Sequence, residues 1–156
     1  MTDSPMSSAR TSTPFLRIPR AILDQMIAHA QREAPQECCG ILGGAGIGVE
    51  VCSIYPLRNA DPNPIKRFES DSRDLLAAHK AIRESRQVWA GIYHSHPKDP
   101  AVPSRTDLER NAYDATPCVI VSLAEAEPCV RVWRLGRDAY WELPWETVES
   151  GGESPA

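Results

Sequence analysis

The chain has 156 residues, of which 42% are hydrophobic and 24% are charged. This length suits one domain with a buried core rather than two, and the proportions are ordinary for a globular protein. The formal net charge of −4 argues against a nucleic-acid partner, which a basic surface would attract. No apolar run approaches the roughly 20 residues that cross a bilayer, so we expect no membrane partner either.

The first residues, MTDSPMSSARTSTP, lack the apolar segment of a signal peptide. We expect a disordered tail over residues 1–14, a folded domain over 15–147 and a second disordered, polar tail over 148–156. With neither a signal segment nor a membrane span, the protein is expected in the cytoplasm.

Five cysteines, an odd number without a signal peptide, argue against an obligate disulfide framework. No CxxC pair occurs, so a thiolate zinc site is not expected, and most cysteines should be small apolar fillers of strands. One pairing stays open as a hypothesis. If the glycine-rich turn is centred near Ala45-Gly46, Cys39 faces Cys52 across a hairpin and the two could form a disulfide.

In chain order, Pro19–Ala34 is the first predicted helix, because apolar residues recur at helical spacing and Pro35 follows. His29 lies in this helix, where we expect a structural role. Strands are predicted over Cys38–Leu42 and Val49–Leu57, joined by a glycine-rich turn. The turn matches neither GxxxxGK[ST] nor GxGxxG, which excludes the phosphate-binding and dinucleotide-binding loops.

Residues 58–66 are a proline- and asparagine-rich loop, and residues 67–69 have the character of a short strand. A helix is predicted from a cap at Ser70 or Asp71 to Gln87, with an amphipathic stripe formed by Leu75, Leu76, Ala78, His79 and Ile82. His79 is expected at the helix surface. The remaining predicted elements are a buried strand over Val88–Tyr93, a helix over Ser104–Tyr113 and strands over Cys118–Leu123, Cys129–Leu135 and Ala139–Leu143. The tryptophans expected in the core are Trp133, Trp141 and Trp145.

The stretch YHSHPKDPAVPSRTD, residues 93–107, carries the chemistry. Side chains alternate along a strand, so His94 and His96 leave the same face. The prolines that follow end the strand and stiffen a loop, which leads to Ser104 and Asp107 at a helix start. Two imidazoles and a carboxylate make three metal ligands and leave a fourth position for water, as catalytic zinc requires. Asp99 is a competing carboxylate, and Ser104-x-x-Asp107 is also an ordinary helix cap.

The pattern His94-Ser95-His96-Pro97, six residues, Ser104, two residues, Asp107 resembles the JAMM signature of MPN-domain metalloproteases at every defined position. That family also has an upstream glutamate in a Pro-x-Glu-x-x-Gly setting, and this chain has Pro35-Gln36-Glu37-Cys38-Cys39-Gly40. The resemblance runs from about Pro19 to Glu146. It implies a single MPN domain of the α+β class, with a mixed β-sheet flanked by helices on a plan related to the cytidine (zinc) deaminases.

The resemblance also implies a role for each residue of the motif. His94, His96 and Asp107 would hold one Zn²⁺ per chain, whose bound water is the nucleophile. Glu37 would be the general base rather than a ligand, and Ser104 would stabilise the oxyanion. Because Ser104 is also a natural helix cap, we expect one oxygen not to serve both roles fully.

The implied activity is hydrolysis of an amide or isopeptide bond after the C-terminal Gly-Gly of a ubiquitin-like or sulfur-carrier protein. The chain looks most like the small prokaryotic members, without large insertions. Release of cysteine from a carrier and cleavage of a lysine isopeptide stay open as alternatives, as do iron, nickel or cobalt in place of zinc and the oligomeric state. A second hypothesis is an inactive MPN scaffold that binds ubiquitin-like partners, although such members usually lack a ligand or the glutamate.

Three other hydrolase classes are excluded by the motif. Metallo-β-lactamases need HxHxDH, but Lys98-Asp99-Pro100 follows the second histidine and its proline. Zinc deaminases need P-C-x-x-C, and Val121 stands where the second cysteine would be. An HxH motif on a TIM barrel would need about 250 residues.

Overall fold

The computed structural model describes residues 15–46, 49–111 and 115–149 of the chain. Within these ranges one sheet contains β1 (Leu16–Pro19), β2 (Cys39–Ala45), β3 (Glu50–Leu57), β4 (Val88–His96), β5 (Cys118–Ser122), β6 (Cys129–Leu135), β7 (Tyr140–Leu143) and β8 (Trp145–Val148). The helices are α2 (Arg20–Glu33), α3 (Ser72–Glu84) and α4 (Arg105–Glu109). The strand order β7-β6-β5-β4-β2-β3-β1-β8 combines parallel and antiparallel pairs, so the fold is α+β with a mixed sheet.

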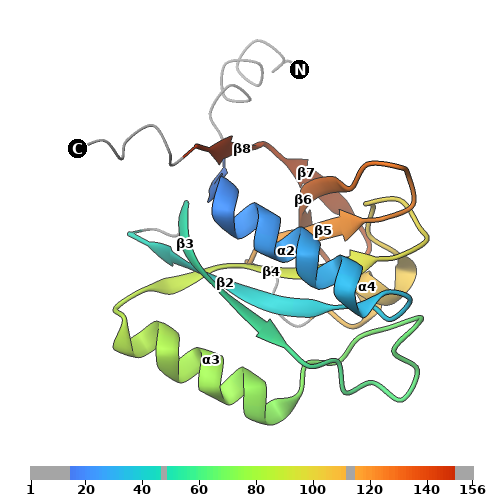
Figure 1. The fold of residues 1–156 in the computed structure, drawn as a ribbon, viewed down its shortest axis with the longest axis horizontal. Coiled ribbons are helices and arrows are strands. Elements are labelled where there is room, and N and C mark those ends of the chain that lie inside the picture. Colours follow the sequence, from blue (N-terminus) through green and yellow to red (C-terminus); the bar gives the residue numbers. More distant parts are fainter. Residues whose placement is uncertain (1–14, 47–48, 112–114, 150–156) are drawn as a thin grey trace.

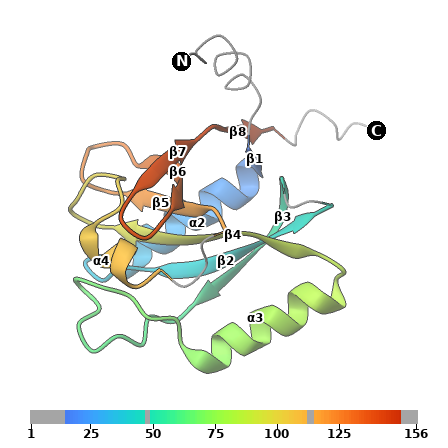
Figure 2. The ribbon, with the colours of Figure 1, turned by 180° about the vertical axis from the view of Figure 1, so that it is seen from behind.

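The two ends of this sheet are joined by a single residue. β7 and β8 are the opposite edge strands, yet only Pro144 separates them in the sequence. Figures 1 and 2 both show them meeting at the top of the molecule. The Pro144 carbonyl accepts a hydrogen bond from the Phe15 amide at 2.6 Å, just before β1. The sheet therefore curls round on itself, which shortens the exposed strand edges.

The helices cover both faces of the curled sheet (Figures 1 and 2). α2 packs on one face, and its buried residues join the largest apolar cluster of the described chain. α3 and α4 lie on the opposite face, over two smaller clusters. The sequence pattern explains this arrangement, because successive strand residues point to opposite faces and each face is apolar where a helix covers it.

β4 shows how this alternation positions functional side chains. Tyr93 is fully buried on the α2 side, where its hydroxyl lies 2.7 Å from Nδ1 of His29. This contact confirms the structural role expected for His29. His94 and His96 consequently point to the face that α3 and α4 cover. The predicted strand over Val88–Tyr93 is confirmed and continues to the second histidine.

Several predicted elements differ in the structure. Residues 67–69 form no strand, whereas β1 and β8 are strands that the sequence analysis missed. α4 ends at Glu109, before the predicted end at Tyr113, and the side chain of Asn111 instead contacts the Leu135 carbonyl at 3.5 Å. Residues 112–114 lie outside the described ranges.

Two apolar residues expected in the core are exposed. Leu76 is 70% exposed because it lies two residues before the buried Ala78, on the opposite side of α3. Trp141 is 54% exposed because β7 is an edge strand. In contrast, Trp133 is buried and Trp145 packs against the main core, as expected.

The proposed Cys39–Cys52 disulfide is wrong. Cys39 pairs with Leu57 across the hairpin, and all five cysteines are free. The hairpin register shifts between Gly43 and Gly44, and this bulge leaves Cys52 without a partner residue in β2. The turn lies later in the sequence than the assumed centre near Ala45-Gly46, because Ala45 is still paired with Glu50.

The expected tails lie mostly beyond the described residues. Residues 1–14 and 150–156 are outside the described ranges, while Val148, which the expected C-terminal tail includes, is the last residue of β8. None of the helices within 15–46, 49–111 and 115–149 has the length and apolar character needed to span a bilayer.

Candidate metal centre and active site

Three side chains converge at the C-terminal end of β4. Nε2 of His94 lies 3.2 Å from Nε2 of His96. The Asp107 carboxylate brings one oxygen to 3.2 Å from His94 and the other to 3.1 Å from His96. All three ligand atoms lie within 4.8 Å of one another and are shielded from solvent. Such a set matches the three protein ligands of a catalytic zinc site.

The tautomer of neutral His96 is set by the hydrogen bond of its other ring nitrogen. Nδ1 of His96 lies 2.8 Å from the Pro100 carbonyl oxygen, which can only accept a hydrogen bond. In the neutral ring, Nδ1 therefore carries the hydrogen and Nε2 is free to bind a cation; without a cation, a proton on Nε2 can be donated to the Asp107 carboxylate, 3.1 Å away. His94 is held by stacking on Phe68, with ring centroids 4.6 Å apart. Both rings are thus oriented as metal ligands require, so the residues fit a divalent cation.

The loop between β4 and α4 is fastened to the sheet at two points. The Ser122 hydroxyl donates to the Asp99 carbonyl at 2.6 Å, and the Trp133 indole donates to the Ala101 carbonyl at 2.9 Å. Asp99 thus serves the loop through its main chain. Among the described residues, the converging ligand group contains Asp107 and not Asp99, which resolves that alternative.

Asp107 is oriented by a capping box at the start of α4. The Asp107 amide donates to Oγ of Ser104 at 3.1 Å, and the Asp107 carboxylate accepts from the Ser104 amide at 2.8 Å. The helix cap and a position suited to a metal ligand are therefore compatible in the same aspartate. The cap satisfies two of the amides at the helix start and fixes the direction of the carboxylate.

Asp107 and His96 stabilise the charged forms of each other. Burial alone would raise the pKa of Asp107, but His94, His96 and the Ser104 amide together hold that pKa far below its usual range. Burial likewise opposes protonation of His96, yet its hydrogen bonds to Asp107 and Pro100 raise the pKa of the imidazole above the ordinary value. Asp107 is therefore an anion across the physiological pH range.

Glu37 lies in the connection between α2 and β2, and it is buried although no helix or strand contains it. Burial raises the pKa of its carboxyl to about 8; the positive charge of His96 opposes the rise and the negative charge of Asp107 adds to it. The Glu37 carboxyl is thus close enough to the three converging side chains for the charges of His96 and Asp107 to change its pKa. A carboxyl with a pKa near neutrality can take and return a proton.

Ser95 is a site residue that the sequence analysis did not assign. It lies between the two histidines, so its side chain points to the other face of β4. Its hydroxyl accepts a hydrogen bond from the Cys38 amide at 2.8 Å, and its own amide donates to the Cys38 carbonyl at 3.1 Å. Ser95 thereby fixes the residue next to Glu37 against the strand that carries both imidazoles. A hydroxyl between two ligand positions was the only sequence signal for this role.

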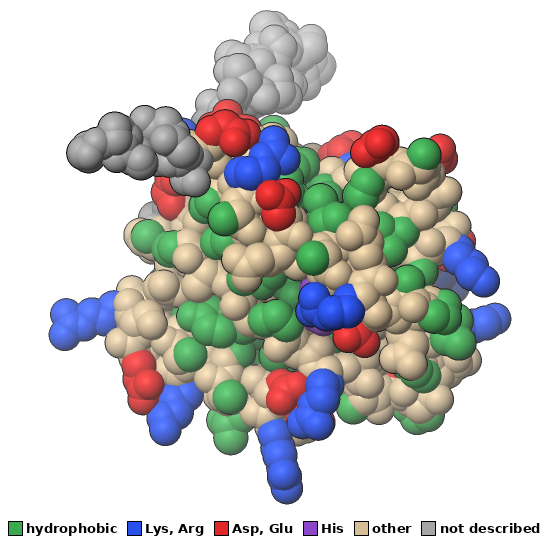
Figure 3. Space-filling model, in the orientation of Figure 1, with side chains coloured by type: hydrophobic (Ala, Val, Ile, Leu, Met, Phe, Trp, Pro, Cys, Tyr) green, Lys and Arg blue, Asp and Glu red, His purple; other side chains and the backbone are tan. Residues whose placement is uncertain are grey.

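A cleft of about 410 Å³ borders the cluster. It opens between α3, α4 and the sheet, and its lining includes Phe68, Leu75, Trp89, His94 and Asp107. An apolar wall beside a polar reactive centre is typical of a binding site. On the face shown in Figure 3, Lys and Arg side chains are scattered among acidic ones and do not gather in one patch.

Comparison with known proteins shows the family to which this chain is similar. Residues 19–136 match the family described as prokaryotic homologs of the JAB domain. The CysO-cysteine peptidase of Mycobacterium tuberculosis is 32% identical over 142 residues, which are 90% of this chain and 97% of that protein. A probable TtuB-protein conjugate cleaving protease of Thermus thermophilus is 40% identical over 94 residues, which are 60% of this chain and 62% of that protein.

The fold gives the same result. A solution structure of a protein from Desulfitobacterium hafniense superposes with a TM-score of 0.79 at 33% identity, covering 86% of this chain and 94% of that one. The matched region contains every motif position that resembles the JAMM signature, from Glu37 to Asp107. The chain therefore belongs to the prokaryotic JAB/MPN-domain family.

Proposed function

We propose that this protein is a zinc metallopeptidase that hydrolyses the amide or isopeptide bond after the C-terminal Gly-Gly of a ubiquitin-like or sulfur-carrier protein. The observation that carries this proposal is the convergence of His94, His96 and Asp107 near the buried carboxyl of Glu37. The names of the relatives, a CysO-cysteine peptidase and a TtuB-protein conjugate cleaving protease, support the substrate class. A plan shared with the zinc deaminases stays a prediction.

His94, His96 and Asp107 would hold one zinc ion per chain. When bound there, the ion would make hydroxide available from water at neutral pH and would polarise the scissile carbonyl. The hydrogen bond from His96 to Pro100 supports this assignment, because it leaves the coordinating nitrogen without a hydrogen.

Glu37 would be the general base. Its carboxylate takes the proton of the attacking water and passes it to the leaving amine, which departs as a neutral amine. The pKa of about 8 supports this role, because a catalytic group works best with a pKa near the working pH. A bound cation would lower that pKa and so favour the carboxylate form in which a base must begin.

Ser104 would donate its hydroxyl hydrogen to the oxyanion that forms when the amide carbon becomes tetrahedral. A hydroxyl has one hydrogen and two lone pairs, and the helix cap uses only a lone pair, which accepts the Asp107 amide. The two roles of Ser104 would then use different parts of one hydroxyl; whether they compete stays a prediction for the variants below to test.

The cleft beside the cluster would receive the carrier's tail. Two final glycines carry no side chains, so the tail can reach His94 and Asp107 along the apolar wall of the cleft. An extended peptide of this kind is bound chiefly through its main chain, with side-chain pockets farther from the reactive bond.

The activity is tested by incubating the zinc-loaded protein with carriers that end in Gly-Gly–cysteine or Gly-Gly–lysine, with products identified by mass. We expect one class to be cleaved. Glu37→Gln should keep one zinc per chain and lose at least about 100-fold in kcat. Ser104→Ala should also lose about 100-fold in kcat, whereas Ser104→Thr, which retains the hydroxyl, should keep most activity.

Exposed residues supply the controls. Glu142 lies on β7, away from the proposed site, so Glu142→Gln should have the zinc content and kcat of the wild type. Tight carrier binding without cleavage by the zinc-loaded wild type would favour the inactive scaffold instead. Full activity of Glu37→Gln would remove that residue from the role of base.

A further inference from the structure

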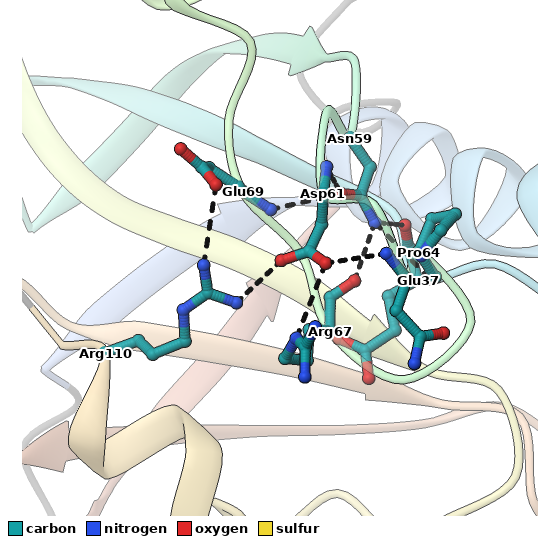
Figure 4. Close-up of polar contacts among 8 residues, drawn as sticks. Glu37, Asn59, Asp61, Pro64, Arg67, Glu69 and Arg110 are labelled. Carbon is teal, nitrogen blue, oxygen red and sulfur yellow. Dashed lines mark hydrogen bonds and ion pairs between the residues drawn. The ribbon is translucent and has the colours of Figure 1, made fainter.

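Residues 58–69 form a loop that makes hydrogen bonds to both the amide and the carbonyl of Glu37 (Figure 4). The Glu37 amide donates to the Pro64 carbonyl at 2.8 Å. The Glu37 carbonyl accepts from Nδ2 of Asn59 at 2.9 Å. Because Glu37 belongs to no helix or strand, these contacts and the Ser95 contact to its neighbour set the position of its carboxyl.

Asn59 also shapes the loop that holds Glu37. Its Nδ2 donates to the Arg67 carbonyl at 2.9 Å, and its Oδ1 accepts from the amides of Asp61 and Glu69, each at 3.0 Å. One side chain therefore joins both ends of the loop. The loop has almost no regular structure, so its shape depends on contacts of this kind.

Asp61 connects this loop to the helix that carries the third ligand. Its side chain is only 1% exposed, and Oδ1 accepts from the Asn63 amide at 2.8 Å and lies 3.4 Å from Nε of Arg67. Its Oδ2 accepts from the guanidinium of Arg110 at 2.7 Å. The hydrogen bond to Arg110 is the main reason that the pKa of Asp61 lies below its usual range. Figures 1 and 2 show the loop beside α4 in both views.

Arg110 is the C-cap residue directly after α4, which contains only Arg105–Glu109. A helix this short is not stable by its own hydrogen bonds, so its orientation depends on what holds its two ends. The capping box at Ser104 holds the start. At the other end, Arg110 contacts Asp61 and, at 3.5 Å, Glu69. Asp107 lies between these two anchors.

We propose that Asp61 is a positioning residue: through Asn59 and Arg110, it fixes the main chain of Glu37 and the helix of Asp107 relative to each other. The loop is thus a brace between the base and the third metal ligand, two residues 70 positions apart in the sequence. Asp61 touches neither the metal site nor the substrate, and it acts only by limiting how far the two groups can move apart. The inference rests on the proposed roles of Glu37 and Asp107.

The test measures zinc affinity by competition with a chromophoric chelator, together with kcat, KM and the melting temperature. Asp61→Asn keeps the shape and the Oδ1 acceptor but loses the charge that Arg110 needs. We expect zinc affinity to fall about tenfold or more, as when other residues that support metal ligands are changed. We also expect kcat to fall by a similar factor while KM stays within about twofold, because no substrate contact is removed.

Arg110 provides the matched pair of variants. Arg110→Gln should reproduce the loss of zinc affinity seen in Asp61→Asn, and Arg110→Lys should restore part of that affinity, because the amine can still reach Asp61 but not also Glu69. Since Arg110 also lines the cleft, KM is compared only for Asp61→Asn. Arg131→Gln removes another arginine that pairs with a carboxylate, Glu142 on β7, and should leave zinc affinity and kcat unchanged, because neither residue is among those that line the cleft. Arg110 is half-exposed, so its variants should fold even where Asp61→Asn does not.

The proposal that Asp61 is a positioning residue would be wrong if Asp61→Asn and Arg110→Gln both lower the melting temperature but leave zinc affinity and kcat unchanged. The loop would then have a purely structural role. Failure of the proposed function gives a different result. If the wild type binds zinc but cleaves no carrier, zinc affinity alone still decides whether Asp61 positions Asp107. If the wild type binds no zinc, both proposals are wrong.

Discussion

At the scale of single residues, the site depends on side chains that each serve two purposes. The Asp107 carboxylate accepts the Ser104 amide in the helix cap, and its two oxygens also lie beside His94 and His96. Ser104 offers a lone pair to the cap and keeps its hydrogen for another partner. Glu37 is the exception: its carboxyl is buried where its charge is poorly solvated, which is costly to the folded state and useful to a catalytic base.

The raised pKa of Glu37 predicts how the stability of the metal-free protein depends on pH. Burial raises the pKa of the Glu37 carboxyl from its ordinary value of 4.5 to about 8 in the folded state. Between these values the folded state binds more protons than the unfolded state, so stability falls as pH rises and the loss is complete above the folded pKa. At about pH 9, metal-free Glu37→Gln should be more stable than wild type by on the order of a few kcal/mol, and near pH 4 the difference should vanish.

Chemical denaturation at several pH values measures this difference. Glu142→Gln is the control, because its pairing with Arg131 lowers the pKa of Glu142, so its contribution to stability changes only in acid. Equal pH dependence of wild type and Glu37→Gln would show that the Glu37 carboxyl is solvated rather than buried.

At the scale of elements, β4 is organised by both of its faces. His94 and His96 point toward α4, while Tyr93 packs toward α2 and contacts His29. The Tyr93 ring lies directly over Gly40 of the neighbouring strand β2, where any side chain would overlap it. The register of β4 is therefore fixed from the face opposite His94 and His96.

Two glycines on paired strands test this packing. Gly40→Ala should destabilise the protein by about 1–3 kcal/mol, because the added methyl group would overlap the buried Tyr93 ring. Gly91→Ala is the matched control: the nearest atom to its added methyl group would be the Pro117 carbonyl oxygen at 3.4 Å, an ordinary contact. That variant should be neutral or slightly stabilising. Denaturant midpoints that rank the two variants in the opposite order would contradict this account of the strand.

At the scale of the whole molecule, the site joins segments that lie far apart in the sequence. Glu37 follows the first helix, the histidines end a central strand, and Asp107 lies on a helix on the opposite face from α2. Metal binding at His94, His96 and Asp107 should therefore stabilise the whole fold, because the strand and the helix that bring these ligands together are held in place only in the folded state.

Zinc at about 1,000 times its dissociation constant should raise the stability by about 4 kcal/mol, or the melting temperature by roughly 10 °C for a domain of this size. The shift should shrink as the pH falls, because protonated imidazoles do not bind metal. Since Asp107 raises the pKa of His96, this loss should begin at a higher pH than for an isolated imidazole. Melting curves with and without zinc measure the shift. His96→Ala should abolish it, and His79→Ala, at an exposed position on α3, should not; a retained shift in His96→Ala would exclude this site.

The elements of the fold that the sequence predicted well are those with a strong local pattern. The helix spacing before Pro35, the apolar run before His94 and the serine and aspartate at a helix start are all encoded within a few residues. β1 and β8 were missed because each has only four residues and is a strand through pairing with distant segments: β1 with β3 and β8, and β8 with β1. The cysteine pairing failed chiefly because the hairpin turn comes later in the sequence than assumed, so that Cys39 pairs with Leu57, and a one-residue bulge then leaves Cys52 unpaired with β2.

By itself, the sequence determined the two histidines on one strand face, the glutamate motif and the family that they resemble, because the residue types and their spacing follow from strand alternation and helix capping. Only the tertiary structure decided that Asp107 rather than Asp99 meets His94 and His96, that Ser95 fixes the neighbour of Glu37, and that Asp61 binds Arg110. The physical reason is that these contacts join residues distant in the chain. Their energy depends on burial and on the partner's position, and neither is written in the residues on either side.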